Sequence, residues 1–150
     1  MRWCGCAKIG NMIKKHSDPQ PKLTHDIQAA LASQLRDRPE ILFGLLYGSA
    51  AEGHPFQDLD VGVYVDRARV PPDLDVDYGF SLAEELNRRL PYPVDVRVMN
   101  DAPLAFRYNV SCGTPLIVND REAFLGFLER TWDEYLDFQP IAMQYLKELA

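Results

Sequence analysis

The sequence predicts an α/β (α+β) fold in which helices flank a small mixed β-sheet. Short apolar runs bounded by glycine or proline, which are typical of buried strands, alternate with longer stretches of helical spacing. Two of these runs follow each other without an intervening helix, which favours an antiparallel pair. The length of 150 residues, with 47% hydrophobic and 25% charged residues, predicts one globular domain.

The first half of the domain is expected to contain one helix and two strands. Apolar residues recur at helical spacing over residues 24–37, where Thr24 is suited to cap the start and Pro39 follows the end. The run at 41–48 (ILFGLLYG) is short and apolar, as expected of a buried strand. In the run at 58–65 (DLDVGVYV), apolar residues alternate with polar or small ones, which predicts one face in the core and the other toward a cleft.

The second half is expected to contain three helices and two strands. The helix at 76–90 places Phe80 on its apolar side, and Pro140 favours a break in the last helix. The aromatic residues of that last helix are interpreted as core, although a partner-binding surface including Tyr135 and Asp137 is the alternative. The remaining expected elements are a strand at 94–99, a helix at 103–112, a strand at 115–119 and the helical region 121–149, whose aromatic residues are Phe124, Phe127, Trp132, Tyr135 and Phe138.

Bulk properties exclude several classes of protein. The net charge is -6, and the sequence has no cluster of basic residues that would bind nucleic acid phosphates, so we expect no direct nucleic-acid partner. The opening segment lacks the apolar run of a secretory signal, and no stretch of the chain is apolar over the length of a membrane span. Three cysteines do not make a disulfide framework, so we expect a cytoplasmic protein without a membrane partner. Residues 1–22 are interpreted as an N-terminal extension and residues 23–150 as the domain.

Three aspartates are the first candidate site residues. Asp58 and Asp60 are two residues apart on an expected strand, so their side chains project from the same face. Asp95 has the same placement on a valine-rich strand, and if the two strands are neighbours the three carboxylates converge. Such carboxylates repel one another unless a cation is present, and their hard oxygens suit Mg²⁺ that is completed by substrate phosphates. Two such ions would clamp a phosphoryl or nucleotidyl transfer.

The second candidate feature is Gly48-Ser49, at the end of the first expected strand. Glycine allows the backbone to approach a phosphate closely, and the Ser49 hydroxyl adds a hydrogen bond. If Ser49 opens a helix, the free N–H groups of that helix start would also point at the anion. Each feature is common by itself, but here a phosphate loop, paired carboxylates and a third carboxylate follow in order.

The segment GLLYGSAAEGHPFQDLDVGVYV, followed by VDVRV, resembles the polymerase-β-like nucleotidyltransferases. The signature of that superfamily is Gly-Ser, a short loop, D-x-D and a later strand carboxylate. The resemblance implies the nucleotidyltransferase fold, with Gly48 and Ser49 as the grip on the ATP triphosphate. It also implies Asp58 and Asp60 as ligands of nucleotide-bound Mg²⁺ or Mn²⁺, and Asp95 as the ligand of the second metal that helps activate the acceptor hydroxyl.

Within the superfamily, residues 24–149 are similar to the minimal nucleotidyltransferase (MNT) branch, including the ending with YLDF at 135–138. The MntA-type antitoxins of HEPN/MNT toxin–antitoxin pairs belong to this branch. The resemblance implies an enzyme that transfers AMP from ATP to a tyrosine of a cognate HEPN-domain RNase toxin, which it also binds.

The chain departs from that pattern in the loop. Many relatives carry an arginine soon after Gly-Ser, whereas this chain has Ala50, Ala51 and Glu52, and Gln57 stands where a serine often precedes the first aspartate. Metal ions, Arg97 or Arg107 are the candidates to supply the missing positive charge. His54 is interpreted as an ordinary loop residue.

Two other functions stay open at this stage. A catalytically weak antitoxin would silence its toxin by binding and occlusion, which the loop without arginine favours. A nucleotidyltransferase acting on a small hydroxylated molecule, such as an aminoglycoside, is the other alternative, although no further domain is evident to enclose such a substrate.

Overall fold

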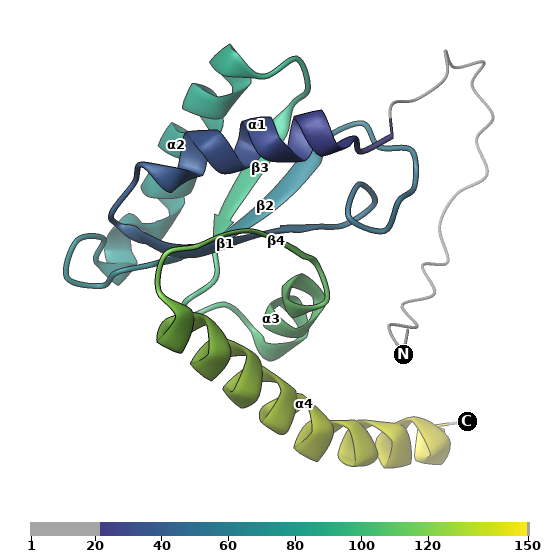
Figure 1. The fold of residues 1–150 in the computed structure, drawn as a ribbon. Coiled ribbons are helices and arrows are strands. Elements are labelled where there is room, and N and C mark those ends of the chain that lie inside the picture. The colour runs from purple at the N-terminus through teal and green to yellow at the C-terminus, as the bar shows by residue number, and fades with distance from the viewer. Residues whose placement is uncertain (1–21, 150) are drawn as a thin grey trace.

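The computed structural model describes residues 22–149, which form a four-stranded sheet with two helices on each face (Figure 1). The strand order is β3-β2-β1-β4. The elements are α1 (His25–Arg36), β1 (Ile41–Tyr47), β2 (Leu59–Val65), a single 3-10 turn η1 (Pro72–Leu74), α2 (Asp75–Arg89), β3 (Val94–Val98), α3 (Leu104–Ser111), β4 (Thr114–Val118) and α4 (Arg121–Leu149). All but Lys22 of the expected extension 1–22 lies outside the described residues.

The sheet is mixed, as predicted. β1 pairs antiparallel with both β2 and β4, and β3 pairs parallel with β2 after the crossover through α2. Parallel neighbours require such a crossover because the chain must return to the starting edge of the sheet. This pairing makes β2 and β3 neighbours, which is the condition that the convergence of the aspartates requires.

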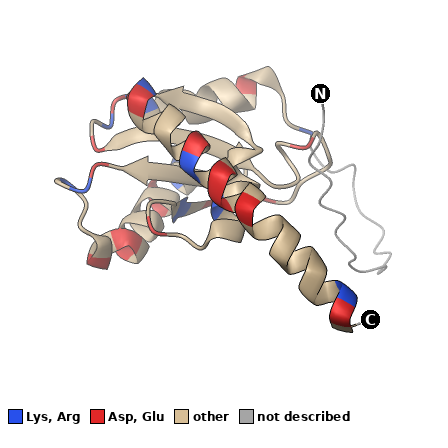
Figure 2. Ribbon diagram, turned by 90° about the horizontal axis from the view of Figure 1, so that it is seen from below, with Lys and Arg blue, Asp and Glu red and all other residues tan. Residues whose placement is uncertain are grey.

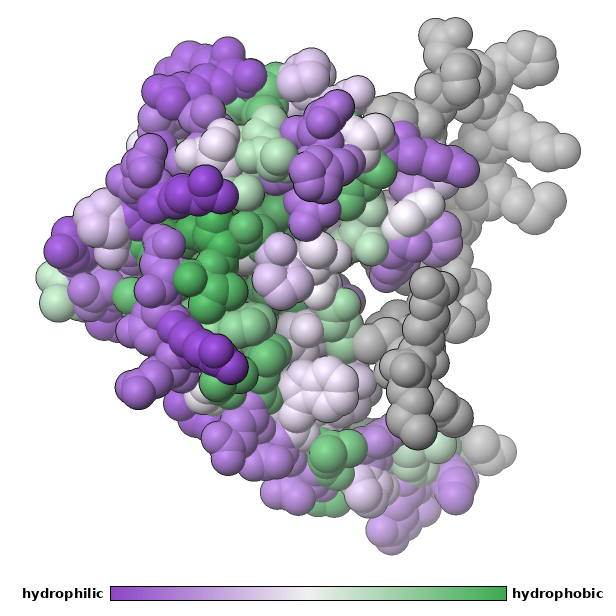
Figure 3. Space-filling view, viewed as in Figure 1, coloured by the Kyte–Doolittle hydropathy of each residue, from purple (hydrophilic) through white to green (hydrophobic). Residues whose placement is uncertain are grey.

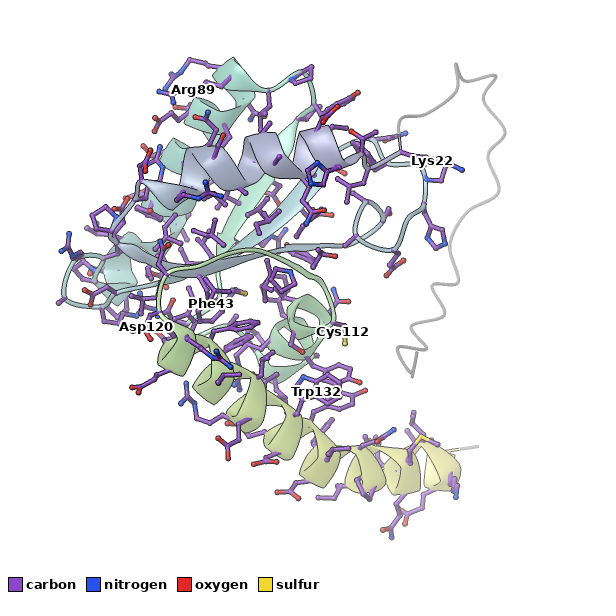
Figure 4. All side chains as sticks on the ribbon, in the orientation of Figure 1. Lys22, Phe43, Arg89, Cys112, Asp120 and Trp132 are labelled. Atoms are coloured by element: carbon purple, nitrogen blue, oxygen red, sulfur yellow. The ribbon has the colours of Figure 1, made fainter. Side chains whose placement is uncertain are left out.

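Each face of the sheet carries its own apolar core. On one face α1 and α2 pack against Val61 and Val63 of β2. On the other face, α3 and α4 enclose a cluster that includes Phe43, which points from β1 toward α4 in Figure 4. The predicted cleft over the second face of β2 is therefore wrong for most of the strand, because Tyr64 stacks on Phe43 beneath α4.

Helix boundaries agree with the sequence, but three predictions inside helices are wrong. Phe80 is 69% exposed. Gly79 is the residue that lies against β3, since a Cβ at position 79 would lie only 2.8 Å from the Val96 carbonyl oxygen. Pro140 does not break α4, which continues to Leu149 and turns in its last third (Figure 1), as a helix does when a proline removes one backbone hydrogen bond. The core interpretation holds for Phe127 but fails for Trp132 and Phe138, which are exposed.

Candidate active site

Three side chains from three adjacent strands form a row at one end of the sheet. Tyr47 of β1 lies opposite Asp60 of β2, and Asp60 lies opposite Asp95 of β3. Residues directly opposite one another on paired strands share a face, so the phenol and the two carboxylates point to the same side. Tyr47 packs edge-on against Phe106 of α3, which places the row at the border of that helix.

Gly48 is held against this row and cannot be replaced without strain. Its φ of +76° lies in the left-handed region that favours glycine. A Cβ at this position would lie 2.5 Å from the Asp60 Oδ2 atom. The chain therefore turns tightly past the Asp60 carboxylate, and the approach of this backbone to a phosphate stays a prediction.

Ser49 is exposed and begins a turn, not a helix, so the expected helix N-terminus at this position is absent. The Glu52 N–H donates to the Gly48 carbonyl (3.1 Å) and the His54 N–H donates to the Ser49 carbonyl (3.0 Å), after which the turn ends at Gly53 with a φ of +76°. The turn stays short because Gly53 and Pro55 do not continue a helix.

Asp58 lies in the bend before β2 and is exposed. It nevertheless adds to the negative potential around Tyr47. The pKa of the Tyr47 phenol is raised above its ordinary value, first by burial and then by Asp60, with smaller contributions from Asp95 and Asp58. All three predicted carboxylates therefore act electrostatically on one phenol at the end of the sheet.

Of the two candidate arginines, Arg97 lies beside the row of Tyr47, Asp60 and Asp95, whereas Arg107 is bound between α3 and α4. The Arg97 Nε atom lies 3.3 Å from the Asp95 Oδ2 atom, and the guanidinium stands over the Phe106 ring, with the side chain 62% exposed. Its pKa is raised, chiefly by the hydrogen bond to Asp95. Arg107 instead donates to the Ala102 carbonyl and pairs with Glu134 of α4 at 2.6 Å, so it connects α3 to α4.

His54 pairs with Glu52 at 3.3 Å on the surface of the loop, which agrees with its interpretation as a loop residue. Sequence reasoning did not single out Tyr47 or Phe106. Tyr47 directly precedes the Gly-Ser motif on an apolar strand, and that position was the available signal. Phe106 carried no signal, because only the packing of α3 brings it to the row.

The donor set fits a hard divalent cation. Asp60 and Asp95 present carboxylates from opposite positions, Asp58 stands two residues before Asp60, and carboxylate oxygens are the ligands that Mg²⁺ prefers. Within residues 22–149, no three carboxylate, imidazole or thiol groups are already gathered into a ligand set. In this conformation Arg97 supplies the countercharge on Asp95.

The profile of the family described as polymerase beta, nucleotidyltransferase matches residues 29–122. The matched segment runs from α1 to the start of α4 and contains every residue of the row, together with Gly48 and Ser49. The chain belongs to this nucleotidyltransferase family. The predictions of the polymerase-β-like superfamily and of its fold are therefore confirmed.

Several solved structures share this nucleotidyltransferase fold. A toxin–antitoxin structure with AMP-PNP is 21% identical, covering 81% of this chain and 97% of that chain with a TM-score of 0.64. The MntA–HepT toxin–antitoxin is 19% identical, covering 84% and 98% with a TM-score of 0.62. The tri-AMPylated Shewanella oneidensis HEPN toxin in complex with its MNT antitoxin is 20% identical, covering 81% and 94% with a TM-score of 0.61. At these identities the likeness establishes a common fold, in agreement with the predicted MNT branch.

No curated protein matches this nucleotidyltransferase chain. Among residues 22–149, no helix has both the length and the apolar composition that crossing a membrane requires.

Proposed function

We propose that this chain is a metal-dependent nucleotidyltransferase, the antitoxin of a HEPN/MNT pair, which transfers AMP from ATP to a tyrosine of its cognate HEPN toxin. The observation that carries the proposal is the row of Tyr47, Asp60 and Asp95 beside Gly48-Ser49, in a chain of the nucleotidyltransferase family. Solved structures of the same fold support the choice of partner and nucleotide, because one contains AMP-PNP and another an AMPylated HEPN toxin.

Each residue of the site has a defined role in this proposal. Gly48 and Ser49 bind the triphosphate, where the left-handed turn at Gly48 lets backbone approach the phosphates. Asp58, Asp60 and Asp95 would hold Mg²⁺ or Mn²⁺, which supplies positive charge to the phosphates when bound. Asp95 also accepts the proton of the acceptor hydroxyl. The hydroxyl oxygen attacks the α-phosphorus, the bond from that phosphorus to the bridging oxygen breaks, and diphosphate leaves.

Arg97 takes the place of the arginine that the loop lacks. It extends from the same face as Asp95, is more than half exposed, and already stands over Phe106 at the border of the row. A guanidinium binds phosphate oxygens through two parallel hydrogen bonds, which suits a triphosphate. Arg107 cannot serve in this way without giving up its bonds to Ala102 and Glu134.

The test is the intact mass of the toxin after incubation with the chain, ATP and Mg²⁺. The acceptor in this test is the cognate HEPN toxin of the proposed pair, and we expect it to gain whole AMP units. Asp95→Asn should stop the gain but keep the complex, because the substitution removes the proton acceptor and leaves the surface of α4 unchanged.

The occluding antitoxin is the second candidate, and the loop at Ala50, Ala51 and Glu52 favours it, because residues 49–58 contain no arginine or lysine to bind the phosphates. Suppression of the toxin without any added mass would establish occlusion and reject adenylylation. A chain that neither binds nor modifies the toxin would instead act on a small hydroxylated molecule.

A further inference from the structure

The second half of α4 leaves the body of the protein. Contacts that join α4 to α3 include the stacked rings of Tyr108 and Tyr135 and the ion pair between Arg107 and Glu134. Figure 4 shows Trp132 beside α3, where its indole N–H donates to the Ser111 hydroxyl at 3.1 Å. Beyond Tyr135 every described residue except Ala142 is exposed, and Figure 1 shows this part of α4 projecting away from the sheet.

The apolar face that packs on the body continues along this projecting part. Steps of three and four residues lead along one side of α4, first through residues that pack against the rest of the domain and then through residues that, apart from the half-buried Ala142, are exposed. The first group is Phe124, Phe127, Thr131 and Tyr135, and the second is Phe138, Ala142, Tyr145 and Leu149. We call the second group, together with the flanking Ile141 and Leu146, the α4 seam. Such spacing is typical of a helix face that packs against another helix.

The exposure of the seam is unusual for a monomer. Phe138 is 53% exposed, Tyr145 63% and Leu149 68%, although each lies on the apolar face of α4. Figure 3 shows hydrophobic side chains on this projecting helix. Contiguous apolar surface of this kind marks interaction sites, and a short helix without packing has marginal stability in water. A second helix laid along the seam would supply both the burial and the packing.

The charges beside the seam select the kind of partner. Residues 132–149 contain four carboxylates and one lysine, and residues 138–146 contain no charge (Figure 2). The carboxylates are Asp133, Glu134, Asp137 and Glu148, of which Glu134 is already paired with Arg107 of α3. A second copy of the chain would bring the same negative charge, and its total of -6, to the contact. Like charges across an interface oppose association, so the surface fits a basic partner.

We propose that the α4 seam is the docking surface for a helix of a basic partner protein, with apolar residues facing the seam and lysine or arginine residues facing Asp133 and Asp137. This inference rests on the proposed function for one point, which is that the partner is the cognate HEPN toxin. The docking surface lies on α4, whereas the row of Tyr47, Asp60 and Asp95 lies at the end of the sheet. Binding of the toxin and transfer of AMP can therefore be impaired separately.

The test compares two double variants in full-length protein. Ile141→Gln with Tyr145→Gln removes apolar surface from the seam, and Val76→Gln with Phe80→Gln removes similarly exposed apolar surface from α2. Affinity is measured by calorimetry against the cognate HEPN toxin of the proposed pair. We expect the seam variant to bind about a hundredfold more weakly, because central apolar anchors dominate interfaces, and the α2 variant to bind within about twofold of wild type.

A charge variant tests the chemistry of the partner. Asp133→Lys with Asp137→Lys should weaken toxin binding about tenfold, whereas it should strengthen any association between copies of the chain. Sedimentation of the chain alone should give a monomer. A dimer that the seam variant dissociates would overturn the proposal in favour of a second copy. Toxin binding that appears only after removal of residues 1–21 would overturn it in favour of that segment.

Binding of AMP-PNP with Mg²⁺ separates failure of this inference from failure of the proposed function. Both double variants should bind the nucleotide as wild type does. Wild-type affinity of the seam variant for the toxin would reject the docking surface and leave the enzyme proposal intact. A wild-type chain that binds nucleotide but no toxin would reject the partner, and this inference with it.

Discussion

Asp60 and Asp95 lie directly opposite each other on neighbouring parallel strands, although 35 residues separate them in the sequence. Two carboxylates in this position repel each other, and the guanidinium of Arg97, 3.3 Å from Asp95, offsets part of that repulsion. The arrangement is suited to receive a cation, because a divalent ion would stabilise both carboxylates at once.

Removing two carboxylates should abolish the stabilisation by nucleotide. For wild type, ATP with Mg²⁺ at about a hundred times its Kd should add about 2.7 kcal/mol to the free energy of unfolding, which is a rise in Tm of roughly 5–10 °C. Asp58→Asn with Asp60→Asn should lose most of this rise. Asp73→Asn with Asp77→Asn, which removes two exposed carboxylates elsewhere, should keep it. An equal rise in both variants would remove Asp58 and Asp60 from the site.

The two arginines should give opposite results. Arg97→Gln should weaken binding of AMP-PNP with Mg²⁺ about tenfold or more, because hydrogen bonds to charged groups contribute about 1.5–3 kcal/mol, and should change the free energy of unfolding little. Arg107→Gln should leave the affinity unchanged and lower the free energy of unfolding by about 0.5–1 kcal/mol, since its partner Glu134 is half exposed. Calorimetry and urea unfolding measure the two quantities. The reverse pattern would assign the phosphate contact to Arg107.

Two glycines with the same φ provide a matched pair. Gly53→Ala should cost about 1–2 kcal/mol of stability, because only the left-handed backbone opposes the methyl group. Gly48→Ala adds a collision with the Asp60 carboxylate to the same strain, so it should cost more and also weaken nucleotide binding. Equal losses of stability in urea unfolding, with nucleotide affinity intact in both variants, would show that the close approach at Gly48 has no consequence.

Tyr47 should make the folded state sensitive to alkaline pH. In the unfolded chain a tyrosine ionises near pH 10, whereas burial and Asp60 raise the pKa of Tyr47 in the folded state. The contribution of Tyr47 to stability is therefore complete below about pH 10 and is lost as the pH rises further. Tyr47→Phe should reduce this alkaline loss in urea unfolding, and Tyr145→Phe, at an exposed position, should leave it unchanged. Identical alkaline curves for wild type and Tyr47→Phe would contradict the prediction.

Local pattern was sufficient for most elements of the fold. The alternation in 58–65 predicted a strand, and the spacing of apolar residues predicted α1, α2 and the start of α4. It failed where burial depends on what the helix meets. Phe80 lies at helical spacing but faces solvent, because Gly79 is the residue that allows α2 to approach β3. Phe138 lies on the apolar face of α4, but in the part of the helix that projects past α3, and it is exposed.

Local patterns were enough to place Asp60 on the polar face of a strand, because alternate residues of a strand share a face, whereas the expected strand position of Asp58 was wrong: this residue lies in the bend before β2. The sequence also determined the family, through Gly48-Ser49 and the aspartates that follow. The pairing of the strands and the packing of α3 and α4 placed Asp95 opposite Asp60, added Tyr47 to the row, and brought Arg97 to it while holding Arg107 against α4. A local period sets the direction of side chains along one element, whereas neighbours across a sheet depend on how distant segments pair to bury their apolar faces.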